Sequence, residues 1–376
     1  MGCGEDMVVA AHIKPEEGAY KIEAVENAEF AAEKLGAPIM NVDANFVVPE
    51  AERHQDFAFP RLTQLHERTE IAEKHGSLIS LADIPRGMRD QRPYRRPDFL
   101  DEWRLLRKAW SLYRRGREDL SRDRVKTATD IFYQSDPLRS LQDWLWRFSL
   151  FLEQPNYEPL FLSAIEVIKP LMQQSGIDNF IKHYNSIASE RSDHYFELMN
   201  AYFDAYNDFA QVFFHVVRGL PIPDGNVASS IDFAATRMFY GNAFEVFSSS
   251  VDILAYANNM SAGRPFDIFE RLTQKQYLRL DKANRFDAFA GIPAFVALCE
   301  ERDNQLRNAS HHGTLRFDRN TQTIRFRAGK GSNGPEQKMG YGTYLARCTK
   351  IFLQAITLLR IEIMMSHSTG AKPPLV

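Results

Sequence analysis

Apolar residues recur three and four positions apart in four stretches between residues 102 and 220, and this spacing predicts amphipathic helices. The stretches are EWRLLRKAWSLYRR, LRSLQDWLWRFSLFLE, LFLSAIEVIKPLMQQ and SDHYFELMNAYFDAYNDFAQVFFHVVRG. The next segment, GLPIPDGN, contains two prolines and two glycines, which interrupt regular structure. We therefore expect a helical domain over residues 101–225 and a domain boundary at its end.

The helical pattern resumes after this break. A long helix is predicted from about residue 234 to residue 260, because apolar side chains gather on one side of it. The opposite side carries a polar stripe formed by Asn242, Glu245, Ser249 and Asp252. Two further helices are expected in FDIFERLTQKQYLRL and in GIPAFVALCEERDNQLRNASHH, and Gly313 is suited to end the second of them.

The end of the chain combines a hairpin with a very apolar helix. TLRFDRNTQTIRFRAG alternates around a polar turn and predicts a β-hairpin. GTYLARCTKIFLQAITLLRIEIMMS repeats apolar residues on a heptad-like seam and is apolar well beyond it, so we expect a partner chain against this helix. The predicted fold class is mainly α, with a C-terminal helical bundle and inserted β-hairpin over residues 226–376.

Residues 1–100 are the least regular part of the sequence. They hold short β-prone pieces between glycines and prolines, and one helical pattern near AVENAEFAAEKLG. The segment PRGMRDQRPYRRPDF then carries three prolines and five arginines, which is typical of an extended basic linker. We expect an irregular or mixed N-terminal region that ends in this linker.

Composition narrows the class of protein. A chain of 376 residues with 44% hydrophobic and 25% charged residues is typical of a folded protein with two or three domains. Three cysteines are too few for a disulfide scaffold or a four-cysteine zinc site. No signal peptide opens the chain, and the longest apolar run is interrupted by Arg360 and Glu362. We expect a cytoplasmic protein without a cofactor.

The end of a predicted helix gathers two proton carriers, one fixed cation and one amide, namely His311, His312, Arg307 and Asn308. Arg307 and His311 share one helix face, and Asn308 and His312 share the neighbouring one. Histidine exchanges protons near neutral pH, and arginine is well shaped to hold a phosphate. No carboxylate lies near the histidines in sequence and no His-x-x-x-His pair occurs, which favours metal-independent acid–base chemistry on a phosphate ester.

RNASHH resembles the R-x4-H motif, with Asn after the Arg, of the HEPN superfamily (higher eukaryotes and prokaryotes nucleotide-binding). Those proteins are small helical bundles, and many are ribonucleases of toxin, abortive-infection and CRISPR-associated systems. The resemblance covers about residues 228–370 and implies Arg307, the polar partner Asn308 and the catalytic His312. His311 lies one residue short of the motif spacing and is the second choice, while Glu245 is the tentative match to an acidic residue on an early helix.

The resemblance implies a metal-independent endoribonuclease in which the ribose 2′-hydroxyl attacks the phosphate, acting as a toxin or antiphage effector. Residues 101–225 would then sense a regulatory or phage-derived protein trigger, and a homodimer through the C-terminal bundle would bring two motifs to one cleft. The alternative is a non-catalytic HEPN-like scaffold or partner-binding protein. The plainer interpretation of the histidines is that they cap their helix, and that of Arg307 is an exposed ion pair with Asp303, which need not exclude catalysis.

A basic stretch runs from residue 86 to residue 126, with 14 Lys and Arg against 7 Asp and Glu in a chain of net charge −3. Aromatic residues are interleaved with these cations, namely Tyr94, Trp103, Trp110 and Tyr113. Cations plus stacking aromatics bind single-stranded RNA, whereas the plainer alternative is a solvated helix face with ion pairs. The tentative RNA-binding residues are Arg95, Arg96, Arg104, Arg107, Lys108, Arg114 and Arg115.

Overall fold

The computed structural model describes residues 8–14, 19–26, 28–30, 99–134, 136–174, 177–222, 228, 230–329 and 334–375. The chain divides into two compact units, Met1–Ile39 and Met40–Val376. In the first unit, β1 (Val8–Lys14) and β2 (Ala19–Glu26) form an antiparallel hairpin. The helix expected over residues 24–36 is wrong for residues 24–26, which end β2, and for residues 28–30, which are not helical. Residues 27 and 31–36 lie outside the described part.

The described part of the second unit is mainly helical, as predicted, and starts with the helices of the expected middle domain. They are α2 (Phe99–Arg114), α3 (Glu118–Phe132), α4 (Leu141–Glu153), α5 (Tyr157–Ile168), the 3₁₀ helix η4 (Lys169–Gln173), α6 (Ile177–Asp204) and α7 (Tyr206–Val217). The last of the four predicted stretches is interrupted at Ala205, whose φ of −107° and ψ of 24° are not helical. Helix α3 was not among those four stretches.

The remaining helices and strands follow the GLPIPDGN segment that interrupts the helical pattern. The helices are α8 (Phe233–Thr236), α9 (Phe239–Ser250), α10 (Asp252–Ser261), α11 (Gln274–Leu278), the 3₁₀ helix η5 (Lys282–Phe289), α12 (Pro293–Leu298), α13 (Asn304–His311) and α14 (Tyr341–Thr369). The strands β3 (Arg316–Asp318), β4 (Thr323–Arg327) and β5 (Glu336–Gly340) form an antiparallel sheet in the order β3-β4-β5. The predicted hairpin is confirmed as β3–β4, and β5 is a third strand that the sequence did not indicate.

The long helix expected over residues 234–260 is interrupted between Thr236 and Phe239 and again at Val251, and three serines explain the second interruption. The hydroxyls of Ser248, Ser249 and Ser250 each donate to the carbonyl four residues earlier, at distances of 2.6, 2.8 and 2.9 Å. Such side-chain bonds compete with the backbone ladder and bend helices. The polar stripe therefore divides, because Asp252 begins a new helix and is buried instead of solvated.

The helix expected to run through GIPAFVALCEERDNQLRNASHH is also two helices, α12 and α13. The backbone at Glu301 is held by Gln354 of α14, which accepts from the Glu301 N–H (2.6 Å) and donates to the Glu301 carbonyl (3.0 Å). Asp303 then caps α13 by accepting from the N–H groups of Gln305 and Leu306 at 2.8 and 3.0 Å. The contact with distant Gln354 thus holds the segment between the two helices, and the local Asp303 cap begins α13.

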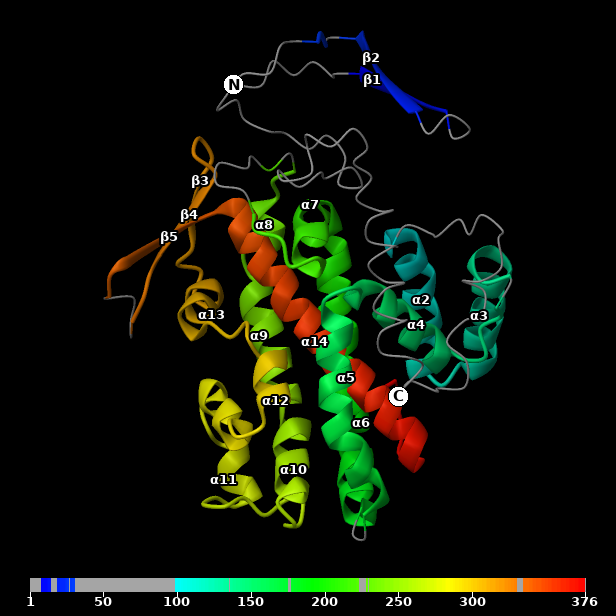
Figure 1. Cartoon of the computed structure of the whole chain (residues 1–376), viewed down its shortest axis with the longest axis vertical. Helices are drawn as coiled ribbons and strands as arrows, with labels where there is room; N and C mark the ends of the chain where they lie inside the picture. Colours follow the sequence, from blue (N-terminus) through cyan, green and yellow to red (C-terminus); the bar gives the residue numbers. More distant parts are fainter. Residues whose placement is uncertain are drawn as a thin grey trace. The chain divides into compact units, whose positions relative to one another are not determined.

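Helix α14 is the axis of the second unit (Figure 1). It packs against α4, α5, α6, α7 and α9, and nearly every side chain from its first turn to Ser366 is buried. The expectation that its apolar surface meets a partner chain is therefore corrected, because helices of the same chain cover that surface. The boundary expected between residues 225 and 226 falls inside this unit, since α14 contacts elements on both sides of it.

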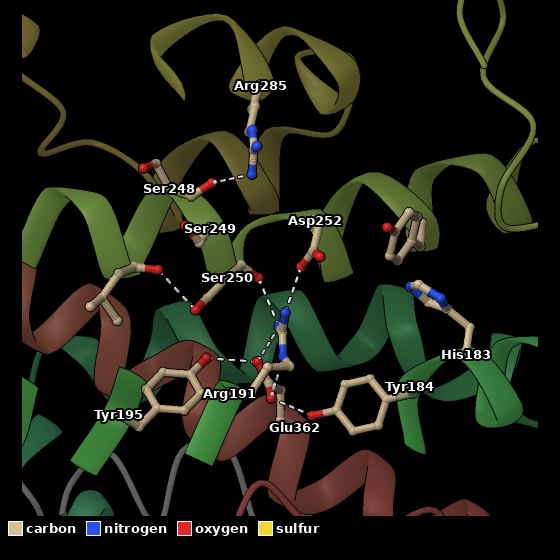
Figure 2. Close-up of polar contacts among 12 residues, drawn as sticks. His183, Tyr184, Arg191, Tyr195, Ser248, Ser249, Ser250, Asp252, Arg285 and Glu362 are labelled. Carbon is tan, nitrogen blue, oxygen red and sulfur yellow. Dashed lines mark hydrogen bonds and ion pairs between the residues drawn. The ribbon is translucent and has the colours of Figure 1, made fainter. Parts of the chain in front are cut away.

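Two opposite charges lie inside this apolar core on α14. Arg191 of α6 donates from Nε to Oε2 of Glu362 (2.9 Å), from Nη1 to Asp252 (2.8 Å) and from Nη2 to the Ser250 carbonyl (3.1 Å), while Tyr195 donates to Glu362 at 2.6 Å (Figure 2). The network joins α6, α9, α10 and α14 through one buried guanidinium that binds two buried carboxylates.

Arg360 is the second buried charge on α14 and has no exposed surface. Its Nη1 donates to Glu153 of α4 and to Glu158 of α5 (2.8 Å), and its guanidinium lies over the rings of Trp146 and Phe161 at 4.5 and 4.0 Å. Burial raises the pKa of Glu153 to about 7, against the opposing effect of Arg360.

Among the described residues, no helix is both long and apolar enough to cross a membrane.

The Arg191 network predicts a stability difference. Arg191→Met leaves Glu362 and Asp252 buried without their cation, so we expect the free energy of unfolding to fall by about 3–5 kcal/mol. The matched control is Arg104→Met, because Arg104 pairs with Asp101 at 2.9 Å with both side chains more than half exposed. That change should cost less than about 1 kcal/mol. Urea unfolding measures both, and equal losses in the two variants would contradict the role of the network.

Candidate active site

Helix α13 is held against α9 at its C-terminal end. Gly241 of α9 donates from its N–H to the Ser310 hydroxyl (3.1 Å), which in turn donates to the Arg237 carbonyl (2.7 Å). A Cβ atom at Gly241 would lie 2.9 Å from Cδ2 of His311, so a larger residue there would displace the ring. The close approach of the two helices brings residues that are 62 positions apart into contact.

The N-terminal end of α13 is fixed by α14. Arg347 binds Glu301 through Nη2 at 2.7 Å and Asp303 through Nη1 at 3.0 Å. Tyr240 of α9 donates its hydroxyl to Glu301 (2.6 Å) and accepts from the Asp303 N–H (2.8 Å). The Asp303 carboxylate therefore caps α13 and binds Arg347. The ion pair between Asp303 and Arg307, which the sequence allowed as an alternative, does not form.

Arg307 pairs instead with Glu245 of α9. Its Nε donates to Glu245 Oε1 at 2.6 Å, its Nη2 donates to the same oxygen, and its Nη1 donates to Oδ1 of Asn308 at 2.7 Å. Lys282 of η5 binds the other oxygen of Glu245 at 2.7 Å. We call Glu245, Lys282, Arg307, Asn308 and His311 the Glu245 cluster. The structure thus brings together the tentative Glu245 with two residues of the motif.

The charge of the Glu245 cluster favours an anionic ligand. One carboxylate faces two permanent cations, and the side chains of Glu245, Lys282 and Arg307 are 27%, 29% and 27% exposed, so solvent reaches them. Burial would raise the pKa of the Glu245 carboxyl, but hydrogen bonds from Lys282 and Arg307 outweigh it and hold this pKa below its ordinary value. A guanidinium has five N–H groups, of which these bonds use three, so two remain for a ligand.

The two histidines occupy different environments. His311 is half-buried, with its ring against Gly241 and its Nε2 atom 3.9 Å from Glu245 Oε1. That Nε2 atom is buried and has no hydrogen-bond partner in the described part of the chain. His312 is the C-cap of α13 and is exposed, and Gly313 follows with a φ of +63°, as expected for the helix end. Among the described residues the His312 side chain has no hydrogen bond or ion pair.

Lys282 is the member of the cluster that the sequence did not indicate. It lies 37 positions from Glu245, in a 3₁₀ helix without a periodic pattern, so no local signal marks it. Its ammonium also donates to the hydroxyl of Ser249 at 2.6 Å. Glu245 and Ser249 do share the predicted polar stripe, four residues apart, and that spacing was the available clue.

The tentative RNA-binding residues have several different surroundings. Arg95 and Arg96 lie outside the described residues, while Arg104, Arg107 and Arg114 form ion pairs with Asp101, Asp204 and Asp193 respectively. Lys108 and Arg115 are exposed and have no ion pair among the described residues. The expected stacking by Trp103 and Trp110 is wrong, because both rings are buried in the core.

Comparison of the chain with protein-family models, with curated proteins and with solved structures gave no match in any of the three. The resemblance to the HEPN superfamily therefore stays a prediction based on the motif. Within the described part of the chain, no three His, Cys, Asp or Glu side chains are grouped in a way that could hold a metal ion.

The pKa of Glu245 predicts a pH-dependent stability effect. Glu245→Gln should lower the free energy of unfolding by about 1–2 kcal/mol near pH 7, because it removes charge-assisted hydrogen bonds at a partly exposed site. Since the folded-state pKa is depressed, this stabilisation is complete above about pH 5 and disappears as the pH falls through the folded-state pKa.

Unfolding curves of both proteins between about pH 3 and pH 8 measure this effect. Glu197→Gln, at an exposed position on α6, is the matched control and should leave stability unchanged. A difference between wild type and Glu245→Gln that persists at the lowest pH would contradict the assignment.

Proposed function

We propose that the protein is a metal-independent endoribonuclease that acts as a toxin or antiphage effector, with the Glu245 cluster and His312 as its active site. One observation carries the proposal: Glu245 and Asn308 orient the Arg307 guanidinium in a partly open cationic cluster. One histidine lies in the last turn of the same short helix and the other at its C-cap. An oriented arginine with spare donors suits the non-bridging oxygens of a phosphodiester.

The proposed reaction uses the nucleophile that RNA already carries. The ribose 2′-hydroxyl attacks the adjacent phosphorus while its proton passes to a base, and the bond from phosphorus to the 5′-oxygen breaks as that oxygen takes a proton from an acid. Arg307 stabilises the negative charge that develops on the phosphorus oxygens. The products are a 2′,3′-cyclic phosphate and a 5′-hydroxyl.

His312 is proposed as a proton-transfer group because its ring is exposed and free to meet a substrate. The reaction needs a second proton carrier, which in the proposed homodimer is supplied by another copy of the chain. With α14 covered by its own chain, that contact has to use another surface of the C-terminal bundle.

A non-catalytic scaffold that binds a partner is the second candidate, and one observation favours it. No described residue orients the His312 ring, whereas catalytic histidines are usually held by a hydrogen bond to the second ring nitrogen. In this case the Glu245 cluster only joins α9 to α13, and the variants described next change stability without any change in activity.

Removal of the Arg307 guanidinium should slow the cleavage of RNA. In excess chelator, the wild-type protein should cut mixed RNA to ends with 2′,3′-cyclic phosphate, and Arg307→Ala should be slower by about 10²–10³-fold, as for removal of a group that stabilises transition-state charge. The matched control is Arg319→Ala, in the exposed β3–β4 turn. Full activity of Arg307→Ala would exclude this active site, and a requirement for divalent metal would exclude the mechanism.

The different environments of the two histidines predict which substitution slows cleavage more. His312→Ala should reduce the cleavage rate by about 10²-fold or more, which is typical when a general acid–base group is removed. His311→Ala should reduce it markedly less, since its ring lies against Gly241 and Glu245 rather than in solvent. Rates are compared after circular dichroism and size-exclusion chromatography show that both variants are folded and of the same size. The reverse order would assign proton transfer to His311.

A further inference from the structure

A basic groove lies between α2, α3 and α6, on elements that contribute nothing to the Glu245 cluster. Its volume is about 620 Å³, within the range of about 300–1,000 Å³ that is usual for small-molecule sites. Three cations line it, Arg107 and Lys108 from α2 and Arg124 from α3, and Phe196, Asn200 and Asp204 of α6 face them. The groove is therefore a separate feature that the proposed active site does not explain.

The cations of the groove are available to a ligand. Lys108 and Arg124 are exposed, and neither has an ion pair among the described residues. Arg107 has a weak pair, since its Nη1 lies 3.5 Å from Asp204 and the two side chains are 41% and 70% exposed. Three positive charges against one negative charge in a chain of net charge −3 make this a local concentration of positive potential.

The wall formed by α6 adds groups suited to a base. Phe196 is held in place by an edge contact with Trp110, at 5.3 Å between ring centroids, and by the Arg114 guanidinium 4.5 Å above its ring. Asn200 also lines the groove, and its half-buried side chain carries an amide NH₂ group that can donate a hydrogen bond to an acceptor on a base.

We infer that this groove binds the phosphate and base of a nucleotide, carried either by single-stranded RNA or by a free nucleotide. Cations that neutralise phosphates, next to a fixed aromatic ring, are the combination that holds single-stranded nucleic acid without reading its sequence. The inference does not rest on the proposed ribonuclease activity, because binding in the groove requires neither histidine nor the Glu245 cluster.

The binding test uses the full-length protein and a labelled 2′-O-methyl oligonucleotide, read by fluorescence anisotropy. This probe lacks the 2′-hydroxyl nucleophile, so it reports binding even if the protein cuts RNA, and failure of one proposal is distinct from failure of the other. Combined Arg107→Ala, Lys108→Ala and Arg124→Ala should weaken binding by about 10-fold or more. The salt dependence should also fall, by about 0.7 in logarithmic slope for each phosphate that the groove no longer neutralises.

The matched control removes the same charge outside the groove. Arg115, Arg117 and Arg122 are exposed on or between α2 and α3 and do not line the groove, and changing all three to Ala should weaken binding less than about 3-fold. Equal effects of the two triple variants would overturn the inference, because the attraction would then belong to the whole surface.

Misfolding can weaken binding but does not strengthen it, so a variant that should bind more tightly is a control for misfolding. Asp204→Asn removes the acid of the groove and releases Arg107, so binding should tighten by about 2–5-fold. Competition with ATP distinguishes the two sources: displacement of the probe at similar concentrations indicates a free-nucleotide site, and displacement by unlabelled RNA alone indicates a strand-binding site. If neither the oligonucleotide nor ATP binds in a manner that depends on the groove cations, the inference is wrong.

Discussion

Burial of two opposite charges on one apolar helix is the constraint on which the rest of the structure depends. Arg360 and Glu362 are two positions apart on α14, and they bind different helices: Arg360 binds α4 and α5, whereas Glu362 binds α6. A shift of α14 along its axis would leave both charges buried and unpaired, which costs several kcal/mol. The register of α14 then fixes the loop before α13 through Gln354 and Arg347, and α13 carries Arg307.

The sequence predicted the elements that depend on local periodicity. The mainly helical fold, the β3–β4 hairpin and the helix end at Gly313 all follow from spacing and turn residues. The interruption at Val251 and the gap between α12 and α13 were missed, because distant groups bind the backbone there or serine hydroxyls compete for it. The apolar excess of α14 was assigned to a partner because periodicity reports that a face is buried and does not identify what covers it.

The candidate site was predictable only where its residues form a local pattern in the sequence. Arg307, Asn308 and the histidines are close together in sequence, and Glu245 stood out by its place on a polar stripe, so sequence alone could suggest them. Lys282 could not be suggested, since only the fold brings η5 to α9. The groove was visible as an excess of positive charge, but the sequence could not separate exposed Lys108 from the buried indole rings of Trp103 and Trp110.

The run of three serines at the end of α9 links the core to the candidate site. The hydroxyl of Ser249 accepts from Lys282. The carbonyl of Ser250, one residue later, accepts from Arg191, as Figure 2 shows. Adjacent serines thus hold one cation of the buried network and one cation of the Glu245 cluster, so a substitution that changes the backbone at this end of α9 would change both contacts at once.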